Sequence, residues 1–232
     1  MSDDHQILQL KRAAAETAVK QIKNGMCIGL GTGTTATFAI AKIGLRLQQG
    51  NLKDITAVST SKRSTALANQ YNIPLLDFST IRKLDIAIDG ADEVDPQCNL
   101  IKGAGGAMLR EREVEQHAEH LIIIVDDSKI VDKLGTHMAL PVEVSQTNWE
   151  PARIALSDLG CSTILRYAEH GPFISDSENF IIDCRFNNGI DDAAALAKNI
   201  EQIDGVLAHG LFLKMATEII VASSNGVRSI KP

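Results

Sequence analysis

The segment Leu84-Asp85-Ile86-Ala87-Ile88-Asp89-Gly90-Ala91-Asp92-Glu93 joins an apolar run to a cluster of carboxylates. The apolar residues before Asp89 predict a buried strand over residues 84–88, as in a parallel sheet that is covered on both faces. Open α/β sheets bind ligands beyond the carboxyl ends of their strands. The acidic residues at the end of this strand therefore predict a ligand site.

A second cluster, Lys102-Gly103-Ala104-Gly105-Gly106, lies further along and is followed by Arg110-Glu111. A lysine on glycine-rich backbone and a glutamate one or two helical turns later can converge on the same mouth of the sheet. Carboxylate, ammonium and glutamate together suit proton transfer on a polar, anionic small molecule. Spacing alone leaves open a simpler alternative, a surface turn followed by the start of a charged helix.

The chain before residue 134 alternates helical and strand-like patterns, which predicts a parallel sheet covered by helices. A first helix is expected to end near Lys23, where Asn24-Gly25 follows. Further helices are expected at about 36–47 and up to about 70, between strands at 26–30, 55–58, 84–88 and 121–125.

The pattern changes near Leu134-Gly135. Strands are expected at 139–144, 162–167, 180–185 and from 206, with helices at about 148–159 and 191–203. This βαββαβ order is that of ferredoxin-like domains. A hairpin of 218–222 and 227–230 is expected to rejoin the first sheet.

We therefore expect an α/β protein with a Rossmann-like parallel-sheet domain and a second, smaller ferredoxin-like α+β domain. The first, catalytic, domain is expected to comprise residues 1–133 plus 208–232, and the second residues 134–207. The chain is expected to leave its first domain, build the second and return.

Composition narrows the class of partner. The 232-residue chain has a formal net charge of −6 and only 4% aromatic residues, so we expect no nucleic-acid partner. The longest aliphatic run, residues 121–125, is too short to span a bilayer. The four cysteines lack metal-ligand spacing, and the polar start lacks signal-peptide features. We expect a cytoplasmic protein without a membrane partner.

The stretch Gly31-Thr32-Gly33-Thr34-Thr35-Ala36 follows a predicted strand and opens a predicted helix. Its spacing fits a dinucleotide fingerprint, but the next predicted strand ends in Ser59-Thr60-Ser61, without an acidic residue for a ribose hydroxyl. Amides, threonine hydroxyls and a helix N-terminus together predict an anion seat, although each threonine can also be a plain helix cap. Positive charge there can come from Lys11, Lys102 or Lys129.

In order along the chain, the motifs GTGTT, IDGADEVD, IKGAGGAMLREREV, VDDSK and LPVEV resemble type A ribose-5-phosphate isomerase. The resemblance covers nearly the whole chain, and the pair DGADE and KGxGGxxxRE is highly specific. The family has a Rossmann-like domain and a small α+β domain. Two mild departures are Thr34, where serine is common, and Ala104, where glycine is common.

The resemblance implies interconversion of ribose 5-phosphate and ribulose 5-phosphate in the non-oxidative pentose phosphate pathway, without metal or organic cofactor. Glu111 is then the general base, and Lys102 stabilises the enediolate. Asp89 and Asp92 bind sugar hydroxyls and assist ring opening and proton transfer between oxygens. The implied substrate-binding residues are Thr32, Gly33, Thr34, Thr35, Asp89, Gly90, Ala91, Asp92, Lys102, Gly103, Ala104, Gly105 and Lys129. The family also implies a homo-oligomer, a dimer or a tetramer.

Other functions stay open at this point. A metal-assisted hydride shift needs a ligand cluster, and the close histidine pair, His117 and His120, is better explained as a solvated helix end. A sugar-phosphate-binding regulatory module needs a DNA-binding element, and no basic recognition helix precedes the first strand. An amino-sugar phosphate deaminase or a lactonase on a similar fold is disfavoured by the DGADE and KGxGGxxxRE motifs.

Overall fold

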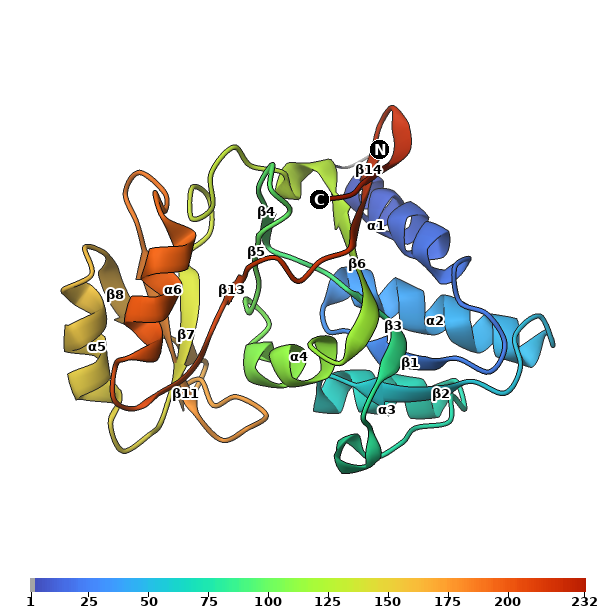
Figure 1. The fold of residues 1–232 in the computed structure, drawn as a ribbon, viewed down its shortest axis with the longest axis horizontal. Coiled ribbons are helices and arrows are strands. Elements are labelled where there is room, and N and C mark those ends of the chain that lie inside the picture. Colours follow the sequence, from blue (N-terminus) through green and yellow to red (C-terminus); the bar gives the residue numbers. More distant parts are fainter. Residues whose placement is uncertain (1–2) are drawn as a thin grey trace. The chain divides into compact units, whose positions relative to one another are not determined.

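The computed structural model describes residues 3–232 and divides into two compact units (Figure 1). The first comprises the chain up to Ala91, Glu111–Lys129 and Met215–Pro232, and the second comprises Asp92–Arg110 and Ile130–Lys214. The chain therefore passes between the units four times. The α/β class expected from the sequence is confirmed, with a parallel sheet at the centre of the first unit.

The first unit contains a six-stranded sheet in the order β15-β14-β6-β3-β1-β2. All neighbours are parallel except the β14–β15 hairpin, which rejoins this sheet through β14 as predicted. The strands are β1 (Cys27–Leu30), β2 (Thr56–Ser59), β3 (Leu84–Asp89), β6 (Ala118–Asp126), β14 (Glu218–Ser223) and β15 (Gly226–Ile230).

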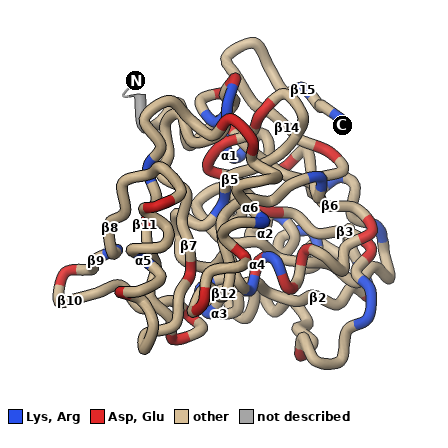
Figure 2. Tube along the Cα trace, turned by 60° about the vertical axis from the view of Figure 1, so that its left-hand side comes forward, with Lys and Arg blue, Asp and Glu red and all other residues tan. Residues whose placement is uncertain are grey.

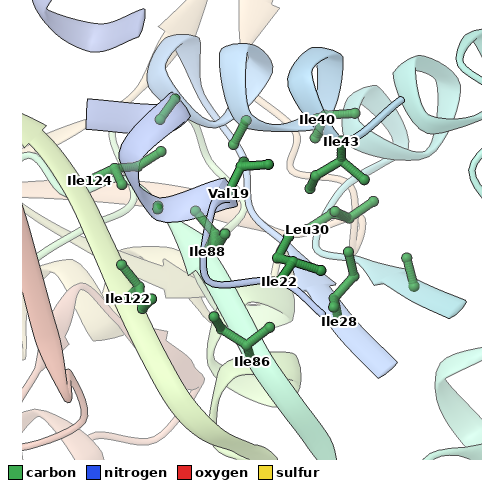
Figure 3. Close-up of a cluster of buried hydrophobic side chains, with 14 of the residues drawn as sticks. Val19, Ile22, Ile28, Leu30, Ile40, Ile43, Ile86, Ile88, Ile122 and Ile124 are labelled. Carbon is green, nitrogen blue, oxygen red and sulfur yellow. The ribbon is translucent and has the colours of Figure 1, made fainter. Parts of the chain in front are cut away.

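The apolar core of this unit lies between the sheet and helices α1 (Asp3–Val19) and α2 (Thr34–Gln48). Figure 3 shows how alternate residues of three parallel strands meet the two helices. The labelled side chains are Val19, Ile22, Ile28, Leu30, Ile40, Ile43, Ile86, Ile88, Ile122 and Ile124. A second cluster, Val58, Leu84 and Val114, is also buried, so the sheet is apolar on both faces, as the continuous apolar runs predict.

Helix α1 ends at Val19, four residues before the predicted end. The carbonyl of Val19 accepts a hydrogen bond from the Arg46 guanidinium at 2.5 Å, and Ile22 N–H donates to the same carbonyl in a tighter turn. These hydrogen bonds satisfy a carbonyl that the end of the helix leaves without its usual partner four residues on. The remaining helices are α3 (Lys62–Gln70) and α4 (Met108–Glu115), with short turns η1 (Phe78–Thr80) and η2 (Asp127–Lys129).

The second unit contains a four-stranded antiparallel sheet in the order β12-β7-β11-β8. With two intervening helices this is the βαββαβ arrangement predicted from the sequence. The elements are β7 (Leu140–Val144), α5 (Trp149–Ser157), β8 (Ser162–Leu165), β11 (Phe180–Arg185), α6 (Ala193–Glu201) and β12 (Val206–His209). The predicted strand 162–167 is broken at Arg166, after which β9 (Tyr167–Ala168) pairs with β10 (Gly171–Pro172).

Three two-residue strands, β4 (Glu93–Val94), β5 (Leu100–Ile101) and β13 (Leu211–Phe212), form a small separate sheet. This sheet places residues 92–110 and 208–214 in the second unit, which differs from the domain boundaries expected from the sequence. Elements of two residues have no periodicity, so the sequence pattern does not indicate them.

Charged residues are scattered along both units, with Lys and Arg interspersed among Asp and Glu (Figure 2). Among residues 3–232, none of the helices is both long enough and apolar enough to span a bilayer.

Candidate active site

Asp89 is the last residue of β3 and is 1% exposed. Its Oδ1 accepts hydrogen bonds from the N–H groups of Thr32, at 2.8 Å, and Gly90, at 2.7 Å. A Cβ added at Gly31 would lie 2.1 Å from the Asp89 carboxyl, so the close approach of the β1 loop to this carboxylate requires glycine. The first glycine loop and the first residue of the acidic motif therefore meet within the first unit.

The stretch 31–35 crosses from β1 into α2, which begins at Thr34 with Gly33 at its N-cap. None of the threonine side chains caps α2, so the simpler explanation of helix caps is wrong. Gly33 has a φ of +106°, a backbone conformation that side chains rarely adopt. The Thr34 hydroxyl accepts a hydrogen bond from Lys11 Nζ at 2.9 Å, which brings one predicted cation to the start of α2.

The Thr32 hydroxyl meets those of Thr60 at 2.7 Å and Ser61 at 2.8 Å, with Ser64 at 3.3 Å. These partners lie in the loop after β2 and the first turn of α3, and sequence reasoning did not assign them. The available signal was their position directly after a predicted strand. The neighbouring carboxyl ends of parallel strands lie at one edge of a sheet, which is why the hydroxyls meet.

Helix α4 carries two buried glutamates, Glu111 and Glu115, one turn apart. One carboxylate oxygen of each glutamate and one of Asp89 all lie within 4.8 Å of one another. The structure therefore brings Asp89 and Glu111 together, as the sequence predicts. Glu115 was missed, although its spacing of four residues from Glu111 places both on one helix face.

The same three carboxylates are the group within the described part of the chain that could hold a metal ion. Oxygen ligands alone suit a hard cation such as Mg²⁺. His117 and His120, the close histidine pair in the sequence, do not belong to this group of carboxylates. The prediction that the pair marks a helix end is wrong for His120. It lies in β6 and is exposed, while the His117 ring contacts the carbonyl of Glu113 at 2.9 Å.

Lys102 follows β5 in the second unit and is 2% exposed. Its N–H donates to the carbonyl of Gly210 at 2.9 Å, and its ammonium lies 5.3 Å from the centre of the Phe212 ring. An ammonium over an aromatic face is stabilised by the ring quadrupole. The loop after Lys102 turns through Gly103, which has a φ of +103°.

Asp92 and Glu93, the last two residues of the acidic motif, hold backbone of the second unit. Asp92 Oδ2 accepts a hydrogen bond from Ala104 N–H at 2.9 Å, which joins the two predicted motifs. Buried Glu93 accepts from the N–H groups of Gly135, His137 and Met138 at 2.5–2.7 Å. Glu93 therefore fixes the turn before β7, a function that the sequence does not indicate.

Lys129 ends the turn η2 directly after β6 and is half-buried. It lies at the carboxyl end of a strand, as predicted. In the same turn the Ser128 hydroxyl donates to the carboxylate of buried Asp126.

Together, a parallel sheet and buried carboxylates beside a glycine–threonine loop are typical of α/β enzymes, and they make the strand ends the candidate site for a small polar ligand. Comparison with known proteins specifies the family. The family model for ribose 5-phosphate isomerase A (phosphoriboisomerase A) matches residues 56–226. The chain belongs to this family, and it is an enzyme that interconverts ribose 5-phosphate and ribulose 5-phosphate.

Curated relatives match nearly the whole chain. The chain is 49% identical over 224 residues to the probable ribose-5-phosphate isomerase 3, chloroplastic, of Arabidopsis thaliana, covering 94% of this chain and 81% of that protein. It is 44% identical over 225 residues to ribose-5-phosphate isomerase A of Prochlorococcus marinus, covering 96% and 95%. The regulatory-module and deaminase or lactonase alternatives gain no support from these relatives.

Solved structures also match nearly the whole chain. A D-ribose-5-phosphate isomerase in complex with phospho-erythronic acid has a TM-score of 0.95 and 38% identity, over 97% of this chain and 99% of that chain. The ribose 5-phosphate isomerase of Plasmodium falciparum has a TM-score of 0.93 and 34% identity, over the same shares.

Proposed function

We propose that Glu111 is the general base of the isomerisation and that Lys102 stabilises the enediolate. The observation that carries the proposal is the convergence of buried carboxylates at the end of β3, where Glu111 and Asp89 lie within 4.8 Å. Burial fixes these side chains and keeps water away from the groups that exchange a proton.

In this proposal Glu111 removes the proton from C2 of the open-chain aldose and returns it to C1. Negative charge develops on the sugar oxygens, where the ammonium of Lys102 balances it. A positioned base contributes ~10²–10⁴-fold and one oxyanion donor about 10²–10³-fold. Asp89 and Asp92 bind the sugar hydroxyls, assist ring opening and move the proton between the two oxygens.

The phosphate is assigned to the start of α2, with Gly33, Thr34 and Thr35 as its nearest groups. The 15-residue helix directs its N-terminus there, and Lys11 already bonds to Thr34. The hydroxyl of Thr32 is engaged with Thr60 and Ser61, so we assign Thr32 to holding the loop against Asp89. Gly90, Ala91, Gly103, Ala104, Gly105 and Lys129 complete the proposed substrate contacts.

Glu111→Gln tests the base. The amide is close in size but accepts no proton, so we expect kcat to fall ~10²–10⁴-fold with the fold retained. Glu113→Gln, on the same helix, is the matched control and should keep the rate. Near-normal turnover of Glu111→Gln in a ribose 5-phosphate assay would remove Glu111 from this role.

Isotope transfer tests the proton route separately. During turnover in heavy water, enediolate chemistry should bring solvent deuterium into the transferred position at least in part. Complete retention of substrate hydrogen, together with loss of activity in a chelator, would instead indicate a hydride shift at a metal.

The pathway, compartment and assembly are also parts of this proposal. We assign the reaction to the non-oxidative pentose phosphate pathway, in the cytoplasm, by a homo-oligomer. The family resemblance supports these assignments, although one relative is named chloroplastic. Light scattering on the purified chain tests the assembly, since a monomer at working concentration would contradict it.

A further inference from the structure

Arg166 interrupts the edge of the four-stranded sheet between β8 and β9. Its Nε and Nη2 donate to the two carboxylate oxygens of Asp183, at 2.9 Å and 2.5 Å. Its Nη1 donates to the carbonyls of Gly103 and Ala104, at 3.1 Å and 3.0 Å. The guanidinium also lies 5.8 Å from the centre of the Phe173 ring. One side chain therefore connects the edge of the four-stranded sheet to the glycine-rich loop after Lys102.

The loop of residues 103–106 has few internal contacts that fix its conformation. Glycine loses more conformational freedom on ordering than any other residue, and three of the four residues after Lys102 are glycine. One internal hydrogen bond joins Gly106 N–H to the carbonyl of Gly103 at 3.0 Å. Contacts from outside the loop must offset the remaining entropy. Two of them come from charged groups, the Arg166 guanidinium and the Asp92 carboxylate.

The two accepted hydrogen bonds also set the direction of the peptide planes. In a trans peptide the C=O of one residue and the N–H of the next point to opposite sides. Because the carbonyls of Gly103 and Ala104 face Arg166, the N–H groups of Ala104 and Gly105 face away from it. The N–H of Ala104 accordingly donates to Asp92 at 2.9 Å.

We propose that Arg166, oriented by Asp183, is a positioning residue for the isomerisation: it holds the carbonyls of Gly103 and Ala104 and so directs the loop amides and Lys102 toward the substrate. This inference rests on the proposed roles of Lys102 and Asp92. Arginine is required here because its planar fork reaches Asp183 and both carbonyls at once, which a single ammonium cannot do.

Arg166→Lys is the deciding variant, since it keeps the positive charge and loses the fork. A displacement of about 1 Å in a reacting group costs on the order of 10²-fold, so we expect kcat to fall about 10- to 100-fold. The KM for ribose 5-phosphate should change much less, because the proposed phosphate contacts lie in the first unit. Asp183→Asn should lower kcat in the same direction, and the double variant should be no slower than Arg166→Lys.

Arg185→Lys is the matched control. Arg185 lies in the adjacent strand β11, is exposed, and bonds to the carbonyl of His137 at 3.4 Å. The same exchange there should leave kcat unchanged. Chemical rescue gives a second readout: ethylguanidinium added to Arg166→Ala should restore part of the lost kcat, which general loss of stability would not allow. If Arg166→Ala fails to fold, Arg166→Lys decides the question alone.

Lys102→Gln in the same assay separates the two levels of the proposal. Full activity of Lys102→Gln would contradict the proposed role of Lys102, whatever Arg166 does. Loss of activity in Lys102→Gln with unchanged kcat and KM in Arg166→Lys would overturn the positioning role alone. A lowered kcat in Arg166→Lys that merely follows a lowered melting temperature, without rescue of Arg166→Ala, would also overturn it.

Discussion

The two glycine-rich loops, 31–35 and 102–106, are held in different ways. The first is held by strand ends of its own sheet: Thr32 bonds to Asp89 at the end of β3 and to Ser61 after β2. The second is held by Arg166 from another sheet and by the carbonyl of Gly210. Both loops carry residues of the proposed site.

The difference has a physical origin. In a parallel sheet the carboxyl ends of neighbouring strands lie at one edge, so the loop after β1 meets residues of β3 whatever the details of the side chains. Nothing in the topology of an antiparallel sheet brings its edge to a distant glycine loop. That contact depends on the length and the planar guanidinium of Arg166. Four predictions test how far the two loops differ.

Gly31→Ala should have the largest effect. The new Cβ would lie 2.1 Å from the buried Asp89 carboxyl, and replacing Asp89 with a smaller residue would remove its proposed role. We expect kcat/KM to fall about 100-fold or more, and the free energy of unfolding to fall by about 1–3 kcal/mol. Steady-state kinetics and urea unfolding measure both.

Gly160→Ala is the control for the general effect of replacing glycine. Gly160 has a φ of +88° and open space around its Cβ position. The Gly160→Ala substitution should lower the free energy of unfolding by about 1 kcal/mol and leave kcat/KM unchanged. Equal kinetic losses in the two variants would show that close approach to Asp89 is irrelevant.

Gly106→Ala should have a smaller and reversible effect. The new Cβ would lie 2.5 Å from the ring of Phe173, a side chain that can be replaced by a smaller one. The φ of +76° at residue 106 adds strain. We expect a fall in kcat of about 10-fold, since the loop must shift. The double variant Gly106→Ala with Phe173→Leu should recover part of that loss. Failure of any recovery would show that strain, and not the contact with Phe173, controls this loop.

Glu93→Gln should affect stability and leave chemistry intact. The carboxylate accepts three backbone N–H bonds, and an amide leaves one of its ends facing a donor. We expect the free energy of unfolding to fall by about 2 kcal/mol, because charge-assisted hydrogen bonds are the strong ones. Below the melting temperature kcat should be normal. A large loss of kcat would place Glu93 in the reaction, beside Asp89 and Asp92.

Glu119→Gln should have the smallest effect, because it removes one exposed ion pair. It therefore shows how little such a charged contact contributes to stability. Glu119 forms an exposed ion pair with Lys83 at 2.8 Å. The hydrogen bond from Lys83, followed by its charge, lowers the pKa of Glu119 in the folded chain. The pair therefore contributes above the unfolded pKa of about 4.3, and the contribution is lost as the pH falls through the folded pKa.

Thermal melts measure this last difference. Wild type and Glu119→Gln should differ slightly at pH 7 in low salt. The difference should decrease as the pH falls through the folded pKa of Glu119, and it should vanish in about 1 M salt, which screens exposed charges. A difference that persists under both conditions would contradict an electrostatic origin.

The strands and helices of both sheets follow closely from local pattern. The apolar runs at 84–88 and 121–125 predicted two central parallel strands, and the predicted bounds 180–185 are those of β11. The acidic residue after Ile88 predicted a site at that end of the strand, and carboxylate oxygens of Asp89 and Glu111 lie within 4.8 Å of each other there. These features depend on residues close in the sequence and on the fixed topology of parallel sheets.

Other parts of the site had no local signal. Glu115 is one more charge on a charged helix, and its burial depends on what packs against it. Glu93 follows Asp92 directly, yet it bonds to backbone 42 to 45 residues away. Arg166 resembles any arginine near a strand end until its partners are known.

The sequence by itself determined the order of elements, the parallel sheet and the edge at which its carboxylates gather, because periodicity and strand topology are encoded within short stretches. Only the tertiary structure decided which neighbouring carboxylates cluster together and which bind backbone distant in the chain. It also decided which distant guanidinium holds the glycine loop. Such contacts form within hydrogen-bond distance between residues far apart in the chain, and no local pattern records them.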